Sequence, residues 1–291
     1  MEFYLGAFLQ GLCLTAMAFG IFISMKIFNI PDITTDGSYT LGGAVTGVML
    51  MGGMSGYLVL PAVMLTGALA GAVTGIIHTR LKINALLAGI LVMTALYSVN
   101  LSLMGRSNIP LLQVGSIFSS IQIAATRDAN ALIVLVAFIG FLFIMLGYVL
   151  KTDFGLAMRA TGNSESMIRA LGVNTDAMKI VGLAIANAMV AVSGYLMTQF
   201  QGFVDINMGI GIVIVGLGSV IIGESLVHTL KIGSIWGILA MMFIGAAAFQ
   251  LVLAFSLSMG IHPNMLKLVT AVFVLLIVGI PRLGFFNVER V

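Results

Sequence analysis

The chain has 291 residues, of which 60% are hydrophobic and only 8% are charged, and its formal net charge is +3. A water-soluble domain carries about 25% charged residues, so this chain has too little charge to cover a globule in water, and its solvent must be lipid. The basic residues fall between apolar runs rather than in one patch, which argues against a nucleic-acid-binding protein. The one cysteine, Cys13, excludes an internal disulfide.

Long apolar runs follow one another along the chain, each close to the roughly 20 residues that a helix needs to cross the hydrocarbon. The runs are continuous rather than alternating, and only helices and closed barrels span a bilayer, so we expect helices. The sequence predicts an all-α, polytopic transmembrane helical bundle with about nine spans (eight to ten) in a single domain, 1–291. The expected spans lie at 3–26, 36–54, 56–78, 83–104, 130–150, 180–202, 209–228, 233–257 and 265–281.

The first two runs need separate comment. The first lacks a basic leading region and a small-residue cleavage site, so we expect a retained span rather than a signal peptide. The second begins at Asp36 and is rich in glycine, so it can also be a broken or re-entrant helix. Its glycines are Gly37, Gly42, Gly43, Gly47, Gly52 and Gly53.

The lysines and arginines indicate the orientation of the bundle, because they concentrate in cytoplasmic loops. With the N-terminus outside, Arg106, Arg127 and Lys267 lie on the outer side and the other basic residues on the inner side. If the second run does not cross, the N-terminus moves inside, but the polar segment 151–179 stays cytoplasmic. The inner basic residues are Lys26, Arg80, Lys82, Lys151, Arg159, Arg169, Lys179, Lys231, Arg282 and Arg290.

The segment 151–179 is the longest polar interruption, and it divides the spans into five before it (3–150) and four after it (180–281). Within it, Asn163 or Ser164 is suited to cap a short helix. Glu165 complements the dipole in the first turn and pairs with Arg169 one turn later. A helix of about two turns is marginal alone in water, so it needs headgroups or a protein groove to dock on.

Both ends of this short helix have a recognisable signal. Gly172 is placed to end it in a left-handed conformation. A second cap, Asn174 or Thr175 with Asp176 behind it, then begins the next span. The helix carries an apolar face made of Met167, Ile168 and Leu171.

Polar residues inside the spans are functional candidates, since they are costly in lipid. Glu224 is the clearest. It can be a structural partner of nearby backbone or of Lys231, part of an inner gate, or a proton carrier. The three histidines, His78, His228 and His262, lack metal-ligand spacing, so no metal site is expected. Candidates to line a pathway, each of which can equally make interhelical hydrogen bonds, are Thr35, Asp36, Ser38, Tyr39, Asn84, Asn100, Asn187 and Gln199.

The run FGLAMRATGNSESMIRALGVNTDAMKIVGLAIANAMVAVSGYL resembles the cytoplasmic coupling region of ABC-importer permeases of the branched-chain amino acid and ribose transport type. The matching features are Gly155, Arg159-Ala160, Gly162-Asn163 and Leu171-Gly172. The resemblance extends to DITTDGSYTLGGAV (32–45), GLGSVIIGESL (216–226) and HPNMLKLVTAVFVLLIVGIPRLG (262–284). Together these stretches resemble the tryptophan and tyrosine permease subgroup more than the sugar or branched-chain ones.

The resemblance implies a multi-pass, non-catalytic permease subunit in the bacterial inner membrane. Two permease copies, expected as a homodimer, would form the pathway, and an extracytoplasmic binding protein would deliver a small solute, with an aromatic amino acid favoured. The chain has no G-x-x-x-x-G-K-[ST] motif, so ATP and magnesium are expected on a separate ATP-binding subunit. The residues expected to couple to that subunit are Arg159, Gly162, Asn163, Glu165, Met167, Ile168, Arg169, Leu171 and Gly172.

Other functions remain open at this point. The solute can instead be a nucleoside, a sugar or a branched-chain amino acid. A secondary transporter driven by an ion gradient would need buried carboxylates or helix breaks in both halves, which Glu224 and Asp36 only approach. An intramembrane enzyme would need a convergent catalytic constellation, and the sequence shows none.

Overall fold

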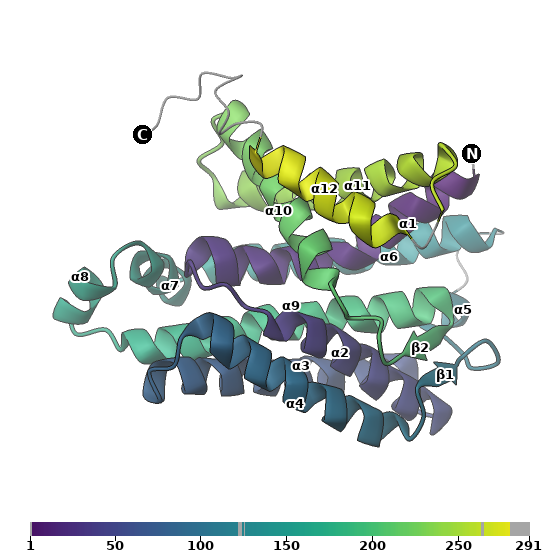
Figure 1. The fold of residues 1–291 in the computed structure, drawn as a ribbon, viewed down its shortest axis with the longest axis horizontal. Coiled ribbons are helices and arrows are strands. Elements are labelled where there is room, and N and C mark those ends of the chain that lie inside the picture. Colours follow the sequence, from purple (N-terminus) through teal and green to yellow (C-terminus); the bar gives the residue numbers. More distant parts are fainter. Residues whose placement is uncertain (1, 122–123, 125, 263–264, 280–291) are drawn as a thin grey trace.

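The computed structural model describes residues 2–121, 124, 126–262 and 265–279 and is almost entirely helical (Figure 1). A π-helix, η1 (Phe22–Ile27), continues α1 (Glu2–Ile21). The other α-helices are α2 (Thr34–Met51), α3 (Gly56–Arg80), α4 (Ala85–Met104), α5 (Ile117–Ser120), α6 (Arg127–Lys151), α7 (Asp153–Asn163), α8 (Glu165–Ala170), α9 (Thr175–Gln201), α10 (Ile212–Thr229), α11 (Ile235–Ser258) and α12 (Leu266–Gly279). Two short strands, β1 (Asn108–Pro110) and β2 (Phe203–Asp205), pair antiparallel.

Each of the nine predicted runs coincides with a helix, which confirms the all-α fold class. Within the described residues, seven helices are long and apolar enough to cross a bilayer, and α2 and α12 are not among them. The count of nine spans therefore stays a prediction. The end of the last run, 280–281, and the basic residues Arg282 and Arg290 lie outside the described residues.

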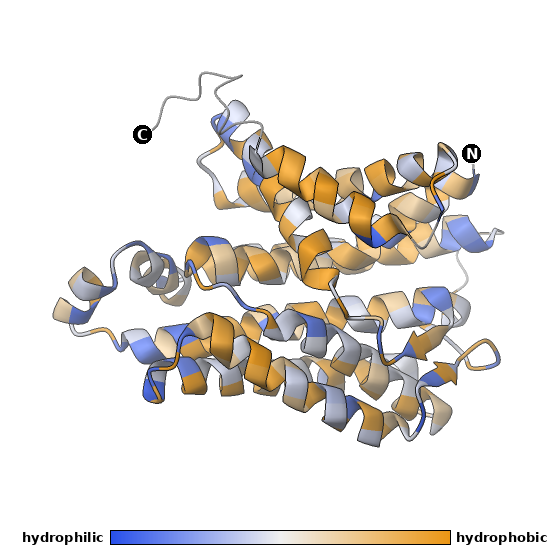
Figure 2. Ribbon diagram, in the orientation of Figure 1, coloured by the Kyte–Doolittle hydropathy of each residue, from blue (hydrophilic) through white to orange (hydrophobic). Residues whose placement is uncertain are grey.

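The two ends of the bundle differ in character. One end carries α7 and α8, and the other carries β1, β2 and α5 (Figure 1). The long helices between them are mostly hydrophobic, and hydrophilic residues concentrate toward both ends (Figure 2). We call the α7–α8 end the inner end and the β1–β2 end the outer end, following the predicted orientation.

Helix α9 is the packing centre of the bundle. It contacts α1, α2 and α3, and 78% of its most apolar stretch is buried. Glycines allow the close approach: a Cβ added at Gly71 of α3 would overlap the carbonyl oxygen of Leu183, and one at Gly42 of α2 would overlap that of Ala191. Small residues that let backbones meet are the usual way helices pack in lipid.

Helix α2 is continuous over Thr34–Met51, but it starts deep in the bundle after an irregular stretch that follows η1. The outer end of α2 packs against the two strands, where Val204 of β2 and Ile109 of β1 fill the space beside Gly47. Almost every residue of α2 is buried. After β2 the chain returns into the bundle and begins α10 beside the first turn of α2, so these two helices start close together and run apart (Figure 1).

Candidate functional site

The polar segment folds as two helices rather than one. Helix α7, which the sequence did not predict, begins after Thr152, whose hydroxyl accepts a 3.3 Å hydrogen bond from the amide of Gly155. Its Met158 and Thr161 are buried, and it packs on α6, α9 and η1. Helix α8 follows directly and contains six residues, none of which is buried.

The ends of α8 match the sequence prediction in part. Ser164 takes the N-cap position, but its side chain makes no capping hydrogen bond, and Asn163 is the last residue of α7. Gly172 ends the helix at φ +86°. The amide of Gly172 bonds to the carbonyl of Arg169 at 3.1 Å, and that of Val173 bonds to the carbonyl of Ile168 at 3.3 Å. This is a Schellman motif, which satisfies the last carbonyls of the helix.

Five side chains, which we call the α8–α9 clamp, fasten α8 to the start of α9: Glu165, Arg169, Thr175, Asp176 and Lys179. The predicted Arg169–Glu165 pair forms at 3.0 Å, and Arg169 also reaches Asp176 at 3.0 Å. Lys179 Nζ lies 2.5 Å from Glu165. Each exposed pair is worth little alone, but the network fixes α8 in one orientation.

The clamp also sets the protonation of Glu165. The Lys179 ammonium donates a hydrogen bond to this carboxylate, and chiefly for that reason its pKa lies below the ordinary glutamate value. Burial opposes the shift, while the charges of Lys179 and Arg169 add to it. The Glu165 carboxylate is therefore ionised at neutral pH, as its ion pairs with Lys179 and Arg169 require.

With the polar side of α8 held by the clamp, the helix and its C-cap residue leave two large apolar side chains exposed: Met167 at 63% and Leu171 at 69%. Ile168, the third member of the predicted face, is half-buried. The two exposed residues lie at the inner end, beyond the body of the bundle (Figure 1). Apolar side chains that lie outside the spans are available to dock on headgroups or on a protein groove, as the sequence predicted for this helix.

The remaining coupling candidates belong to the attachment of α7. A Cβ added at Gly162 would overlap the carbonyl oxygen of Ile27, so only glycine fits against η1 here. The side-chain amide of Asn29 donates to the carbonyl of Gly162 at 3.3 Å. Arg159 is half-buried and bonds to the carbonyl of Gly155 within its own helix at 3.4 Å.

A buried polar network joins α2 to α9 and α3. The side-chain amide of Asn187 donates to Asp32 at 2.7 Å and its oxygen accepts from Ser38 at 2.7 Å. The hydroxyls of Thr34 and Thr74 are 2.7 Å apart. All five side chains are under 5% exposed. The prediction included Ser38 and Asn187 but missed Asp32, although a carboxylate just after Pro31 and between two helical runs was visible in the sequence.

Asp36, a second carboxylate in this region, caps another helix. It accepts hydrogen bonds from the amides of Gly211 at 2.8 Å and Val213 at 2.9 Å. These amides belong to the N-cap residue and the second residue of α10, where a negative charge is favoured by the helix dipole. Asp36 therefore ties the first turn of α2 to the first turn of α10. Thr35 is also buried and donates to the carbonyl of Asp32 at 3.2 Å.

The other pathway candidates do not gather at one place. Asn84 is exposed and caps α4 by accepting from Leu86 at 2.9 Å. Asn100 joins α4 to α2 through the carbonyl of Gly37 at 3.2 Å. Tyr39 is 2% exposed, and its carbonyl lies close beside Gly194 of α9. Gln199 lies at the outer end.

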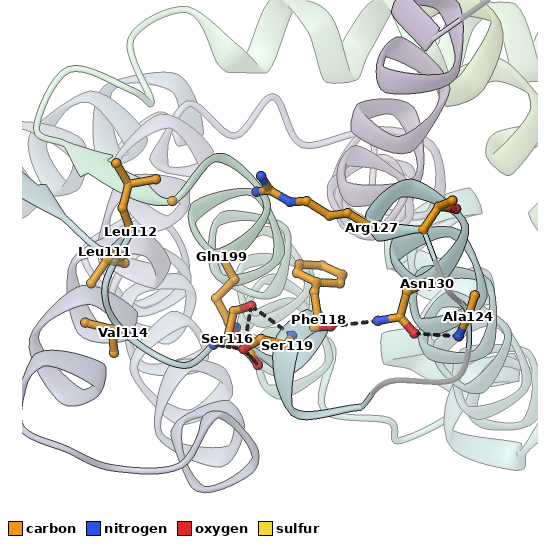
Figure 3. Close-up of a pocket in the computed structure, with 12 residues that line it drawn as sticks. Leu111, Leu112, Val114, Ser116, Phe118, Ser119, Ala124, Arg127, Asn130 and Gln199 are labelled. Carbon is orange, nitrogen blue, oxygen red and sulfur yellow. Dashed lines mark hydrogen bonds between the residues drawn. The ribbon is translucent and has the colours of Figure 1, made fainter.

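Gln199 borders a cavity of about 500 Å³ (Figure 3). Its side-chain oxygen accepts from the amide of Ile117 at 2.9 Å, which holds α5 against α9. In Figure 3 the side chain of Arg127 extends from α6 across the cavity in the direction of Gln199. The residues around the cavity are Leu111, Leu112, Val114, Ser116, Phe118, Ser119, Ala124, Thr126, Arg127, Asn130, Gln199 and Gly202.

Glu224 forms an ion pair with Lys26 of η1 and not with Lys231, which was one of the partners considered from the sequence. His228, one turn further along α10, lies 3.8 Å from the same carboxylate. The side chains of Lys26 and Glu224 are 37% and 29% exposed. Sequence spacing could not have revealed this pair, because its members lie on helices far apart in the chain.

Comparison with known proteins places the chain in a family. The family model described as branched-chain amino acid transport system / permease component matches residues 3–279. The chain is 40% identical to a tyrosine transport system permease protein of Clostridioides difficile, over 91% of this chain and 87% of that protein. It is 32% identical to an uncharacterized protein of Rickettsia prowazekii, over 94% and 95%.

A more distant relative is a probable branched-chain amino acid transport permease protein, LivH, of Methanocaldococcus jannaschii. It is 27% identical over 68% of this chain and 66% of its own length. No solved structure matches the chain. The chain therefore belongs to the family of membrane permease components of branched-chain amino acid-type ABC transport systems, as its resemblance to that family indicated.

Proposed function

We propose that this chain is the membrane subunit of an ABC importer that takes up an amino acid, with an aromatic one favoured. The support is its membership of the permease family and its 40% identity to a tyrosine transport permease over most of both chains. In this proposal two copies form the pathway in the bacterial inner membrane. A binding protein outside delivers the solute, and two ATP-binding subunits inside carry the ATP and magnesium.

The observation that carries the proposal is that α8 is attached on one face and exposes apolar side chains on the other. The α8–α9 clamp holds it at one orientation, and the face opposite the clamp presents Met167 and Leu171 to solvent. A short helix that is fixed on one side and apolar on the other is suited to enter a groove on a soluble subunit. Closure of the ATP-binding subunits would then pull on α8 and tip the bundle between outward- and inward-facing states.

The first test is gentle purification of the tagged protein from its native membrane, followed by mass spectrometry. We expect a stoichiometric ATP-binding subunit. The double variant Met167→Asp with Leu171→Asp should lower that recovery about tenfold or more, because two apolar anchors are lost from one interface.

Leu230→Asp is the matched control, since Leu230 is 59% exposed after α10 and is not part of α8. It should leave recovery unchanged. Normal recovery and normal coupled transport in the double variant would overturn the role proposed for α8.

A second candidate function is a secondary transporter driven by an ion gradient, favoured by the buried carboxylates of Asp32 and Asp36. Carboxylates near helix breaks are typical of ion-coupled sites. Protein purified without any ATP-binding subunit that still transports in proteoliposomes under an ion gradient would support this function and exclude the importer.

A further inference from the structure

The π-helix η1 is a junction between three parts of the molecule. It extends α1 by six residues at the inner end, and the chain then turns through Asn29, which has a positive φ of 55°. π-helical segments are rare and often occur at functional sites. Three elements that are distant in sequence meet at this junction: α7, α9 and α10.

The contact with α7 is tight and specific. Gly162 leaves room for the carbonyl of Ile27, and the Asn29 side chain bonds back to the carbonyl of Gly162. The contact with α9 is also close, because the ring of Phe28 fills the space where Gly182 has no side chain. The junction therefore has little freedom to slide against α7 or α9.

The contact with α10 differs, because it includes an ion pair in addition to the packing of α10 against α1. Lys26 of η1 meets Glu224 in the last third of α10. The first turn of the same helix is held by the Asp36 carboxylate through the amides of Gly211 and Val213. Helix α10 is thus attached by a charge near each end, to η1 at the inner end and to α2 deeper in the bundle.

We propose that the Lys26–Glu224 ion pair links α7 and α8 to α10, so that movement of the coupling segment changes the tilt of α10. This inference rests on the proposed function, since it assumes that α8 is pulled by a partner. It assigns Lys26 and Glu224 as positioning residues and gives the π-helix a role as the connecting element. Movement at η1 displaces Lys26, and the carboxylate of Glu224 follows because an unpaired, partly buried charge is costly at this depth.

Contact alone does not couple two elements energetically, so the test must measure coupling. The importer is reconstituted with its ATP-binding subunits and binding protein, and solute taken up per ATP hydrolysed is measured. The variants are Lys26→Glu, Glu224→Lys and the double exchange. Wild-type protein that shows no ATP-driven uptake would contradict the proposed function itself and not this link.

If the link operates, each single reversal lowers uptake per ATP about tenfold while the subunits still co-purify. The double exchange restores it to within about threefold of wild type, since the pair re-forms with its charges swapped. Lys231→Glu is the control, because within the described part of the chain Lys231 makes no ion pair. It should keep wild-type coupling.

Three results would overturn the inference: wild-type coupling in the single reversals, a double exchange no better than the worse single, or loss of the assembled complex in all of them. Lys26→Gln and Glu224→Gln guard against misfolding, because they remove charge without introducing like-charge repulsion. They should lower the melting temperature less than the charge reversals do, and they should still lower coupling.

Discussion

The α8–α9 clamp and the network around Asp32 both join distant segments, but they do so in opposite surroundings. The clamp consists of four charged side chains and Thr175 at the inner surface, where Arg169 and Glu165 are 59% and 39% exposed. The network consists of one carboxylate, one amide and three hydroxyls, all under 5% exposed. Water competes for the exposed bonds of the clamp, whereas the polar atoms of the network must be satisfied by one another and by nearby backbone groups.

This difference means that the clamp mainly affects the direction of α8, whereas the network mainly affects the free energy of unfolding. An exposed ion pair contributes little to the free energy of unfolding, yet several pairs together can fix the direction of a short helix. A buried carboxylate must keep its hydrogen-bond donors, because an unsatisfied charged group is costly in a medium of low polarity. We therefore expect changes in the clamp to alter coupling and changes in the network to alter folding.

The largest effect is expected for Asn187→Leu. It removes the amide that donates to Asp32 and accepts from Ser38, so the melting temperature in detergent should fall by an amount equivalent to about 3 kcal/mol. Asn84→Leu is the matched control, because Asn84 makes one exposed cap bond. It should cost about 1 kcal/mol. Equal losses for the two variants would show that the network has no special role.

A smaller effect is expected for Gly162→Ala, which tests the attachment of α7 between these two regions. The new methyl group would overlap the carbonyl of Ile27, and such overpacking costs about 1–3 kcal/mol. The variant should unfold at a lower temperature and be cut faster by protease within 151–174. Gly6→Ala, where a Cβ meets nothing within 4 Å, should be neutral or stabilise by about 0.5–1 kcal/mol. Normal protease resistance in Gly162→Ala would contradict the contact.

The smallest effect on stability is expected for Glu165→Gln, at below about 1 kcal/mol. The orientation of α8 should nevertheless loosen, which the anisotropy of a fluorophore on Ser166→Cys can report. The one natural cysteine, Cys13, is fully buried and so adds little background. An unchanged anisotropy in Glu165→Gln would show that the clamp does not orient α8.

The same fluorophore should detect a pH dependence. The pKa of Glu165 is lowered in the folded protein, so the contribution of its ion pairs is complete above the unfolded glutamate value of about 4.3 and is lost as the pH falls through the lower, folded value. Anisotropy should therefore decrease in that acidic range and not near neutrality. Glu165→Gln should remove this transition, and a transition that persists in it would assign the change to another group.

The features that the sequence predicted well depend on short spacing or on composition. The nine helical runs follow from apolar length, the left-handed end at Gly172 from one glycine, and the Glu165–Arg169 pair from a separation of one turn. The features that it missed join residues distant in the chain. Lys179 reaches Glu165 only because the chain reverses at Gly172, and Lys26 meets Glu224 only in the folded bundle.

Two pathway candidates, whose role stays a prediction, also have partners that the sequence did not indicate. Asp36 was expected at a pathway, and its observed partners are amides of α10, which no pattern in 32–45 could indicate. Asn84 was a pathway candidate because it is polar near a span, and its observed contact is a helix cap. Polarity within a run identified which residues need partners but not which partners they find.

The burial of α2 has a consequence for how the protein is made. A helix leaves the translocon easily when it is apolar, and polar and charged residues oppose its insertion. Helix α2 carries Asp36 together with four threonines, a serine and a tyrosine, and it is not among the helices apolar enough to span alone. We infer that α2 enters the bilayer together with α3 and α4 and becomes fully shielded only when α9 and α10 have been synthesised.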